Sequence, residues 1–336
     1  MTKDSMNDGA GFRRRSLLKA VAGGAAAGVA GWPSLSGAQA EYPAQAIDLI
    51  VPWPPGGPND VVMRALANAA SKPLGQPLVI INKPGAGGTL GTAAMAATAK
   101  PDGYTISQFM VSMLRYPHMQ QVSYDPLKDF SYIIGIGGSS TGIIVRADAP
   151  WKSFKDMIEY AKAHPGEVSY ASTGQGTTLH MAMEEVARQT GAKFLHVPYK
   201  GTSETTVALM GGQAMLQLDT IGVPMVRAGK ARVLALFTEK RNPKLPQVPS
   251  LKELGIDVVA TSPYGIAGPR NMSPAVVARL HDAFKQAMTD PQFVSTLEDN
   301  AQEPWYQSGA DYARWAVQAY ETEGRLVKAI GMGKPG

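Results

Sequence analysis

The chain of 336 residues contains no cysteine at all. This absence excludes a disulfide scaffold, cysteine-ligated zinc or iron–sulfur sites, a thiol nucleophile and an N-terminal lipid-modified cysteine. Charged residues are scarce as well, at 18% of the chain, whereas 44% of the residues are hydrophobic. That composition is typical of a folded protein with a sizeable core, and the length predicts about two domains.

Clustered positive charge is missing from most of the chain. The formal net charge is +5, but residues 1–40 hold five Lys or Arg and two acids, so residues 41–336 carry a net charge of only +2. A nucleic-acid-binding protein usually keeps a basic face in its folded part, so that class is excluded. After residue 40, the sequence has no apolar run long enough to span a bilayer.

The first 40 residues have the features of an export signal. A basic segment, Arg13–Lys19, precedes a weakly apolar stretch rich in Ala and Gly, and the segment ends in Ala38-Gln39-Ala40. A basic start, an apolar middle and a small-x-small end are typical of a cleavable signal peptide, and twin arginines favour the Tat route. We therefore predict a twin-arginine-type signal peptide over residues 1–40, cleaved after about Ala40, and a mature protein that is soluble in the periplasm.

Strand-like and helix-like segments alternate along the rest of the chain. Ile47–Val51 and Val79–Ile81 are β-branched runs, whereas Asp60–Leu74 and Ser153–Ala163 have helical periodicity, the latter with Ser153 as N-cap. Alternation of this kind predicts an α/β fold whose sheets are covered by helices on both faces.

One motif resembles a catalytic serine but has the wrong surroundings. Gly138–Gly142 matches the G-x-S-x-G nucleophile elbow, which lies between a strand and a helix, yet the following Ile143–Arg146 is strand-like. We therefore favour a bend between two strands and predict that the protein is not an enzyme. A periplasmic serine hydrolase that uses Ser140 or Ser172 with His180 is kept as a remote alternative.

Cofactor and metal motifs are absent from the sequence. Gly85–Gly91 follows a strand, but Leu90 occupies the place of the third glycine of a dinucleotide loop, and no acid follows in the ribose position. The five histidines are scattered, without the spacing of metal ligands. We predict no cofactor and no metal, while the glycine-rich loop could still approach a smaller anion.

Three other segments combine a strand end, a turn and a helix start. They are Val51–Asp60, Ala171–His180 and Met215–Thr220. Helix N-termini leave backbone N–H groups unpaired and carry partial positive charge, so they accept carboxylate or phosphate. Gly56 and Gly57 let the backbone approach a ligand that side chains would block. The three segments therefore predict a site for an anion.

Several side chains in these segments have two interpretations each. Asn59 or Asp60 is expected to cap its helix. Trp53 is either core packing or the apolar wall of a pocket. His180, in the first turn of its helix and off the buried stripe, is expected to be neutral and able to face a ligand. Asp219 ends an apolar strand, where it either caps the following turn or contacts the ligand.

Several short motifs occur in a recognisable order and spacing. In the first half they are VPWPPGG from Val51, PGAGG from Pro84, PDGYT from Pro101 and YDP from Tyr124. In the second half they are HVPYKG from His196, GGQ from Gly211, AGK from Ala228 and LPQVPS from Leu245. Together they resemble the Bug family, the periplasmic solute-binding proteins of tripartite tricarboxylate transporters, over nearly the whole mature chain.

This resemblance implies a type II periplasmic-binding fold, an α/β fold with two domains joined by two crossover hinges around a ligand cleft. Mapped onto this chain, residues 41–141 and 265–336 form domain 1, and residues 142–264 form domain 2. In the family, the loops that match residues 52–60 and 173–180 face each other across the cleft. They hold a ligand carboxylate largely through backbone amides and bridging waters.

The ligand-binding residues predicted in this way come from five parts of the chain. They are Pro52, Trp53, Gly56, Gly57, Asn59, Ala86, Gly87, Thr173, Gly176, Thr177, Thr178, His180, Asp219 and Tyr264. The chain departs from the family pattern at Trp53 and Pro55, where Phe and Ala are usual, and at Tyr264, where many members have Trp.

The function implied by the resemblance is an extracytoplasmic receptor. It captures a small organic carboxylate by cleft closure and delivers it to the integral membrane subunits of a tripartite tricarboxylate-type transporter. The expected ligand is a mono- or dicarboxylate, and Trp53 and Tyr264 favour an aromatic one. A sensor that presents its ligand to a membrane-bound regulator is the alternative. We expect a monomer with no nucleic-acid partner.

Overall fold

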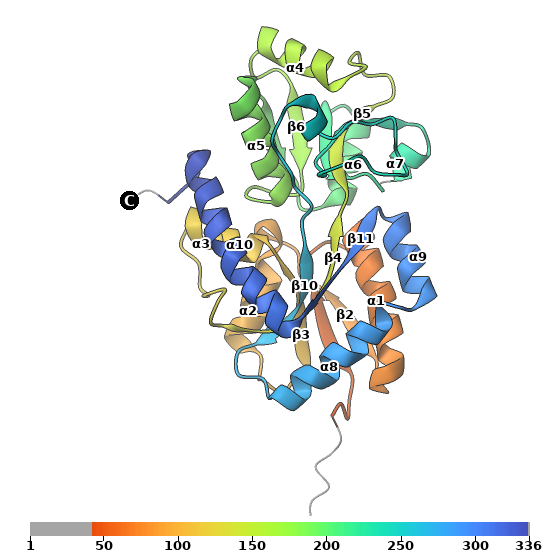
Figure 1. Ribbon diagram of the computed structural model, residues 1–336, viewed down its shortest axis with the longest axis vertical. Coiled ribbons are helices and arrows are strands. Elements are labelled where there is room, and N and C mark those ends of the chain that lie inside the picture. The colour runs from red at the N-terminus through yellow and green to blue at the C-terminus, as the bar shows by residue number, and fades with distance from the viewer. Residues whose placement is uncertain (1–41, 223, 335–336) are drawn as a thin grey trace, which may run out of the picture. The chain divides into compact units, whose positions relative to one another are not determined.

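The computed structural model describes residues 42–222 and 224–334. In Figure 1 these residues form two lobes, each built on its own β-sheet, which we call the lower and the upper lobe. The predicted signal peptide, residues 1–40, lies outside the described residues. Within the described part of the chain, no helix has both the length and the hydropathy needed to cross a bilayer.

The lower lobe contains a mixed six-stranded sheet with the order β11-β4-β10-β3-β1-β2. β1 pairs in parallel with β2 and β3, whereas β10 runs antiparallel to β3 and β4. The strands are β1 (Ile47–Val51), β2 (Leu78–Asn82), β3 (Thr105–Met110), β4 (Phe130–Ser139), β10 (Tyr264–Pro269) and β11 (Gln302–Ser308).

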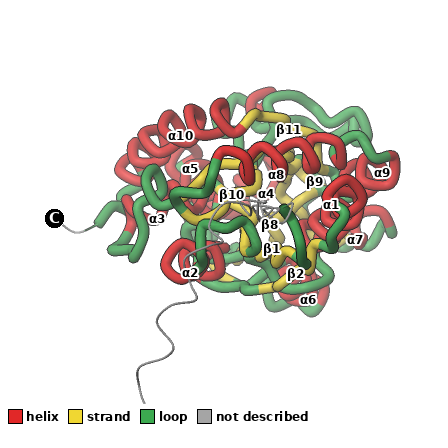
Figure 2. Tube along the Cα trace, turned by 90° about the horizontal axis from the view of Figure 1, so that it is seen from below, coloured by secondary structure: helices red, strands yellow, loops and turns green. Residues whose placement is uncertain are grey.

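Helices cover both faces of this sheet, as Figure 2 shows from below. One face packs on α1 (Pro58–Leu74), α8 (Pro274–Ala287) and α9 (Pro291–Asp299). The other face packs on α2 (Leu90–Thr98), α3 (Ser112–Met119) and α10 (Gly309–Ala329). Apolar side chains fill both layers, which confirms the predicted covering of the sheet.

The upper lobe contains a five-stranded sheet with the order β7-β6-β8-β5-β9. Its strands are β5 (Thr141–Arg146), β6 (Ser169–Ser172), β7 (Leu195–Pro198), β8 (Leu216–Thr220) and β9 (Ala231–Leu236). Its helices are α4 (Phe154–Ala163), α5 (Thr178–Thr190), α6 (Thr202–Met210) and α7 (Pro224–Arg227). The expected capping box is present at the start of α4, where Ser153 and Asp156 exchange hydrogen bonds.

Two crossovers join the lobes. The chain passes from the lower to the upper sheet between Ser139, which ends β4, and Thr141, which begins β5, and it returns between Leu236 and Tyr264. As expected, the segment Gly138–Gly142 joins two strands instead of a strand and a helix, and Ser140 alone lies between them.

Candidate functional site

A cavity of about 70 Å³ lies where the two lobes meet. That volume holds several water molecules or one compact small molecule. Its walls come from both lobes and from segments that are far apart in the sequence. They are formed by Trp53, Pro54, Gly57, Pro58, Asn59, Gly87, Met110, Val111, Ser112, Ser139, Thr141, Thr173, Thr177, Thr178, Leu179, Gly201, Thr202, Ser203, Asp219, Thr220 and Ser262.

The N-termini of three helices open onto this cavity. Its wall contains residues 57–59 at the start of α1, residues 177–179 at the start of α5 and residues 201–203 at the start of α6. Each set consists of the N-cap residue and the first two helical residues. Apart from Pro58, which has no N–H, these residues have N–H groups without a partner within the helix. Among the described wall residues, none is Lys, Arg or His, so the positive potential comes from backbone N–H groups.

The α5 end is the one that lacks a local acid. The first turn of α1 contains Asp60 and that of α6 contains Glu204, whereas α5 has no acid in its first turn. The Thr177 hydroxyl donates to the carbonyl oxygen of Gly174 at 2.8 Å and does not cap the helix. Met181 N–H is paired, with the carbonyl of Thr177 at 3.1 Å. The N–H groups of the first helical residues are therefore available to an anion in the cavity.

The turn before α5 depends on two glycines. Gly174 and Gly176 have φ values of 137° and 72°, in the region that favours glycine. A Cβ atom on Gly176 would lie 2.9 Å from the ring of Tyr116 and 3.1 Å from Met119, both on α3 of the lower lobe. Glycine at this position therefore allows the turn and the close approach of the two lobes.

Asp219, at the end of β8, forms the acidic part of the wall. Its Oδ1 accepts hydrogen bonds from Thr202 Oγ1 at 3.0 Å and from Thr220 N at 2.8 Å. Its Oδ2 accepts from Thr205 Oγ1 at 3.1 Å and from Gln217 Nε2 at 3.3 Å. Burial raises the pKa of Asp219 to about 6, although these hydrogen bonds act in the opposite direction. The carboxylate is therefore ionised at neutral pH and also fixes the Thr202 side chain.

His180 lies behind the α5 end and not in the cavity wall. Its ring is 4% exposed, and its Nδ1 accepts a hydrogen bond from Gly176 N–H at 3.0 Å. The ring stacks on that of His196, with centroids 3.9 Å apart. Burial and the nearby Arg115 lower the pKa of His180 to about 4, so it is neutral at pH 7, as expected. It does not line the cavity, because its ring packs inside the upper lobe against His196 and Tyr170.

Two polar groups in the wall have no hydrogen-bond partner among the described residues. They are the Nε1 atom of Trp53 and the hydroxyl of Ser112, whose side chain is buried. Trp53 also packs against the lower-lobe core, so it is both core packing and part of the apolar wall of the cavity. Buried polar groups are rarely left unpaired, so both atoms are candidates for bonds to a ligand or to water.

Eight of the predicted site residues line the cavity, and six do not. The eight are Trp53, Gly57, Asn59, Gly87, Thr173, Thr177, Thr178 and Asp219. The six are Pro52, Gly56, Ala86, Gly176, His180 and Tyr264.

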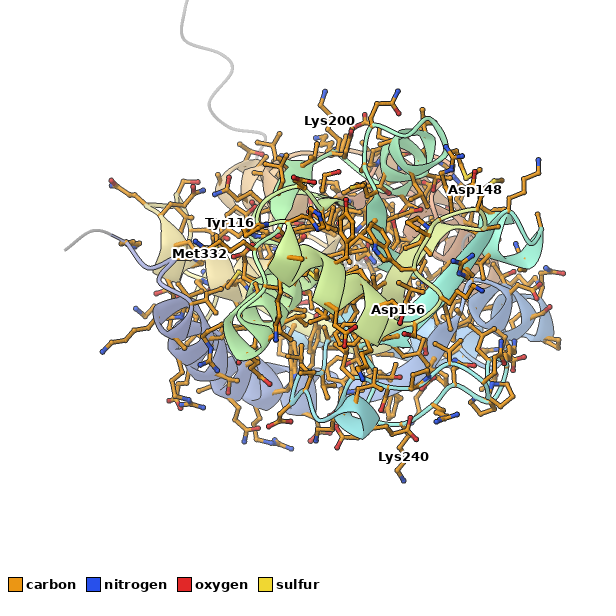
Figure 3. The ribbon with its side chains drawn as sticks, turned by 90° about the horizontal axis from the view of Figure 1, so that it is seen from above. Tyr116, Asp148, Asp156, Lys200, Lys240 and Met332 are labelled. Carbon is orange, nitrogen blue, oxygen red and sulfur yellow. The ribbon has the colours of Figure 1, made fainter. Side chains whose placement is uncertain are left out.

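Several of these six occupy supporting positions. The N–H of Gly56 donates to Asp60, which braces the first loop, and the Tyr264 hydroxyl donates to Gln302 inside the protein. Ala86 borders an outer cavity with Tyr116 and Met332, which are labelled in Figure 3.

Sequence reasoning missed the α6 end and the hydroxyl of Ser112. Thr202 and Ser203 follow a strand and Gly201, which is the same pattern that identified the other two loops. The preceding strand, β7, has only 4 residues and is partly exposed, so its sequence gives a weak strand signal. Ser112 begins α3, a helix that contains Pro117 and that the sequence analysis did not predict.

The serine hydrolase alternative lacks its proposed pair. Ser140 Oγ donates to Glu303 Oε1 at 3.0 Å, and Ser172 Oγ lies 2.7 Å from Nε2 of His196, not of His180. Ser172 is fully buried and lies outside the cavity wall. In the described part of the chain, no group of three or more His, Asp or Glu residues is arranged to hold a metal ion.

A protein-family model matches most of the chain. Residues 62–332 match the tripartite tricarboxylate transporter family receptor. The chain is 43% identical to the "UPF0065 protein in gbd 5'region" of Cupriavidus necator, over 96% of this chain and 99% of the relative. It is 30% identical to protein BugT of Bordetella pertussis, over 85% of this chain and 91% of the relative.

Solved structures of similar chains have the same fold. The periplasmic binding protein BugD is 29% identical with a TM-score of 0.83, over 88% of this chain and 100% of that one. R. palustris Rpa4515 with adipate is 27% identical with a TM-score of 0.82, over 87% of this chain and 99% of that one. MatC of Rhodopseudomonas palustris with bound malate is 26% identical with a TM-score of 0.80, over 85% of this chain and 100% of that one. These likenesses confirm the predicted type II periplasmic-binding fold.

Proposed function

The chain belongs to the tripartite tricarboxylate transporter receptor family, and from that premise we propose that it is an extracytoplasmic receptor for a small organic carboxylate. In this proposal the protein captures its ligand between the two lobes and delivers it to the integral membrane subunits of a transporter. It does so without catalysis, as expected of a binding protein. Residues 1–40 direct export and are removed, which leaves the mature receptor in the periplasm.

The convergence of three helix N-termini on one cavity carries this proposal. The α1 end comes from the lower lobe, whereas the α5 and α6 ends come from the upper lobe. A carboxylate between them would receive hydrogen bonds from both lobes and would bind most tightly when the lobes are closed. Closure then follows from the difference in affinity between the two arrangements.

Similar proteins support a carboxylate as the ligand. The structures of Rpa4515 and MatC contain adipate and malate respectively, and both are carboxylates. In this chain, the unpaired N–H groups at the helix starts and the unpaired Ser112 hydroxyl are suitable donors to a carboxylate. Trp53 adds an apolar wall, whereas Tyr264 is buried elsewhere and contributes no aromatic surface to the cavity.

A thermal-melting screen tests the binding function directly. The purified protein is melted alone and with mono- and dicarboxylates, hydroxy acids, amino acids and aromatic acids. A ligand at about 100 times its dissociation constant adds about 2.7 kcal/mol to the free energy of unfolding, which raises the melting temperature measurably. We expect shifts from carboxylates and none from the matched amides. Stabilisation by the amides alone would contradict the proposal.

Uptake measurements test the delivery step separately. Deleting the gene should abolish uptake of the radiolabelled ligand and leave the transcriptional response to it unchanged. The sensor alternative predicts the opposite pair of results.

A further inference from the structure

The hydrogen-bonding groups of the cavity wall are divided between its two ends. At the α5 end the wall offers donors, because the first N–H groups of α5 are unpaired and the helix has no acid in its first turn. Thr178 Oγ1 accepts a hydrogen bond from Arg115 Nη2 at 3.4 Å, which leaves the hydroxyl hydrogen of Thr178 free to donate. The buried Ser112 hydroxyl is unpaired and lines the same cavity.

At the Asp219 end the side chains offer acceptors, beside the N–H groups at the start of α6. The Thr202 hydroxyl donates its hydrogen to Asp219, so only its lone pairs are available to a ligand. The Thr220 hydroxyl donates to the carbonyl of Asn300 at 2.9 Å, so it too has only lone pairs available to a ligand. Asp219 itself is ionised at neutral pH and has only lone pairs to offer.

The charged groups around the cavity also differ between its two ends. Asp219 lies against the start of α6 through its bond to Thr202, and Glu204 lies in the first turn of α6, so two acids offset the positive end of that helix. The α5 end has no acid in its first turn, and the Arg115 guanidinium, which is paired with Glu323, lies behind it. A second carboxylate on the ligand would therefore meet repulsion from Asp219 at that end of the cavity.

We propose that this receptor selects a bipolar ligand, whose carboxylate binds at the α5 end and whose hydroxyl, amino or amide N–H group donates to Thr202 and Asp219. This inference rests on the proposed function and narrows it to hydroxy, amino or amide acids. It disfavours ligands with an ionised carboxylate at each end.

A matched series of acids tests the selectivity. The ω-hydroxy and ω-amino acids of three to six carbons are compared with the dicarboxylates of the same lengths by titration calorimetry at pH 8. We expect the best hydroxy or amino acid to bind about tenfold or more tightly than the matched dicarboxylate. In Asp219→Asn this ratio should fall below about threefold, because the amide can donate a hydrogen bond and carries no charge.

Two further variants complete the test. Asp148→Asn makes the same change at an exposed carboxylate, labelled at the edge of the upper lobe in Figure 3, and should keep the parent ratio. Thr202→Val removes the acceptor hydroxyl with little change of shape, so it should weaken the hydroxy or amino acid about tenfold and leave the dicarboxylate within about twofold. Thermal melting first establishes whether Asp219→Asn folds. If it does not, Thr202→Val alone tests the inference.

The outcomes separate this inference from the proposed function. If the parent protein binds dicarboxylates as tightly as the matched hydroxy and amino acids, or if both cavity variants keep the parent ratio, the bipolar site is overturned and the carboxylate receptor stands. If no acid of either kind binds, the proposed function fails, and this inference fails with it.

Discussion

The guanidinium group of Arg115 reaches across the boundary between the lobes to the backbone of Gly176. Its Nη1 atom donates to the Gly176 carbonyl at 2.8 Å, while its Nε atom donates to Glu323 on α10 at 2.6 Å. Arg115 is 1% exposed, so both contacts are shielded from water. One lower-lobe side chain thus ties the α5 turn of the upper lobe to the C-terminal helix. We infer that this tie favours the closed arrangement.

Arg115→Lys should weaken ligand binding about tenfold. A lysine keeps the positive charge beside Glu323 but cannot make the several directed bonds of a guanidinium, so the tie to Gly176 is lost. Titration calorimetry measures the affinity, and small-angle scattering measures the compaction that accompanies binding. Arg325→Lys, on an exposed side chain of the same α10, should change neither. An unchanged affinity in Arg115→Lys would show that the tie does not favour the ligand-bound arrangement.

Gly176→Ala should destabilise the protein and weaken its binding together. The residue has φ of 72°, which costs a non-glycine residue about 1–2 kcal/mol, and the new methyl group would also press on Tyr116 across the lobe boundary. Gly166→Ala is the matched control, because Gly166 has φ of 82° but no atom within 4 Å of the added methyl group. Both variants should lose stability in urea unfolding, Gly176→Ala more than Gly166→Ala, and only Gly176→Ala should lose affinity.

Thr178→Val should reduce the affinity for the carboxylate about tenfold, because it removes a hydroxyl donor from the α5 end and leaves the fold intact. Thr98→Val is the control, since Thr98 is exposed at the end of α2 and bonds only its own helix. Equal affinities in the two variants would place the carboxylate elsewhere in the cavity.

Acidification should destabilise the protein through His180 and His196. Burial, with Arg115 nearby, lowers the pKa of His180 from 6.5 to about 4, and burial beside His180 lowers the pKa of His196 to about 4. Between pH 6.5 and 4 the unfolded chain therefore binds more protons than the folded protein. The free energy of unfolding accordingly falls as the pH drops through this window, and the contribution is complete above pH 6.5.

Urea unfolding at a series of pH values checks this dependence. Asp219 acts in the opposite direction. Its pKa is raised in the folded protein, so the stability that it adds at low pH is lost as the pH rises from about 4 to 6. The contribution of the histidines is therefore obtained by comparing the free energy of unfolding of His196→Gln with that of the parent protein at each pH. The variant should lose less stability between pH 6.5 and 4 than the parent protein does. Parallel curves for His196→Gln and the parent would refute the assignment.

Local patterns in the sequence were enough to predict most of the secondary structure and part of the site. The strand at Ile47–Val51 has the bounds that the sequence predicts, and the predicted helix at Asp60–Leu74 begins only two residues earlier, at Pro58. Ser153 is the N-cap of α4, as predicted, whereas the N-cap of α1 is Gly57 and not Asn59 or Asp60. These features depend on periodicity, turn chemistry and capping, which act over a few neighbouring residues.

What the sequence by itself determined was therefore the α/β alternation, the family, and the loops that begin α1 and α5. Only the tertiary structure decided that α6 completes the cavity, that Ser112 and Thr202 line it, and that His180 is buried behind it. The physical reason is that these features depend on contact between the lobes. Arg115 and Gly176 are 61 residues apart in the chain and meet only where α3 of the lower lobe lies against the turn before α5, so no local pattern encodes their relation.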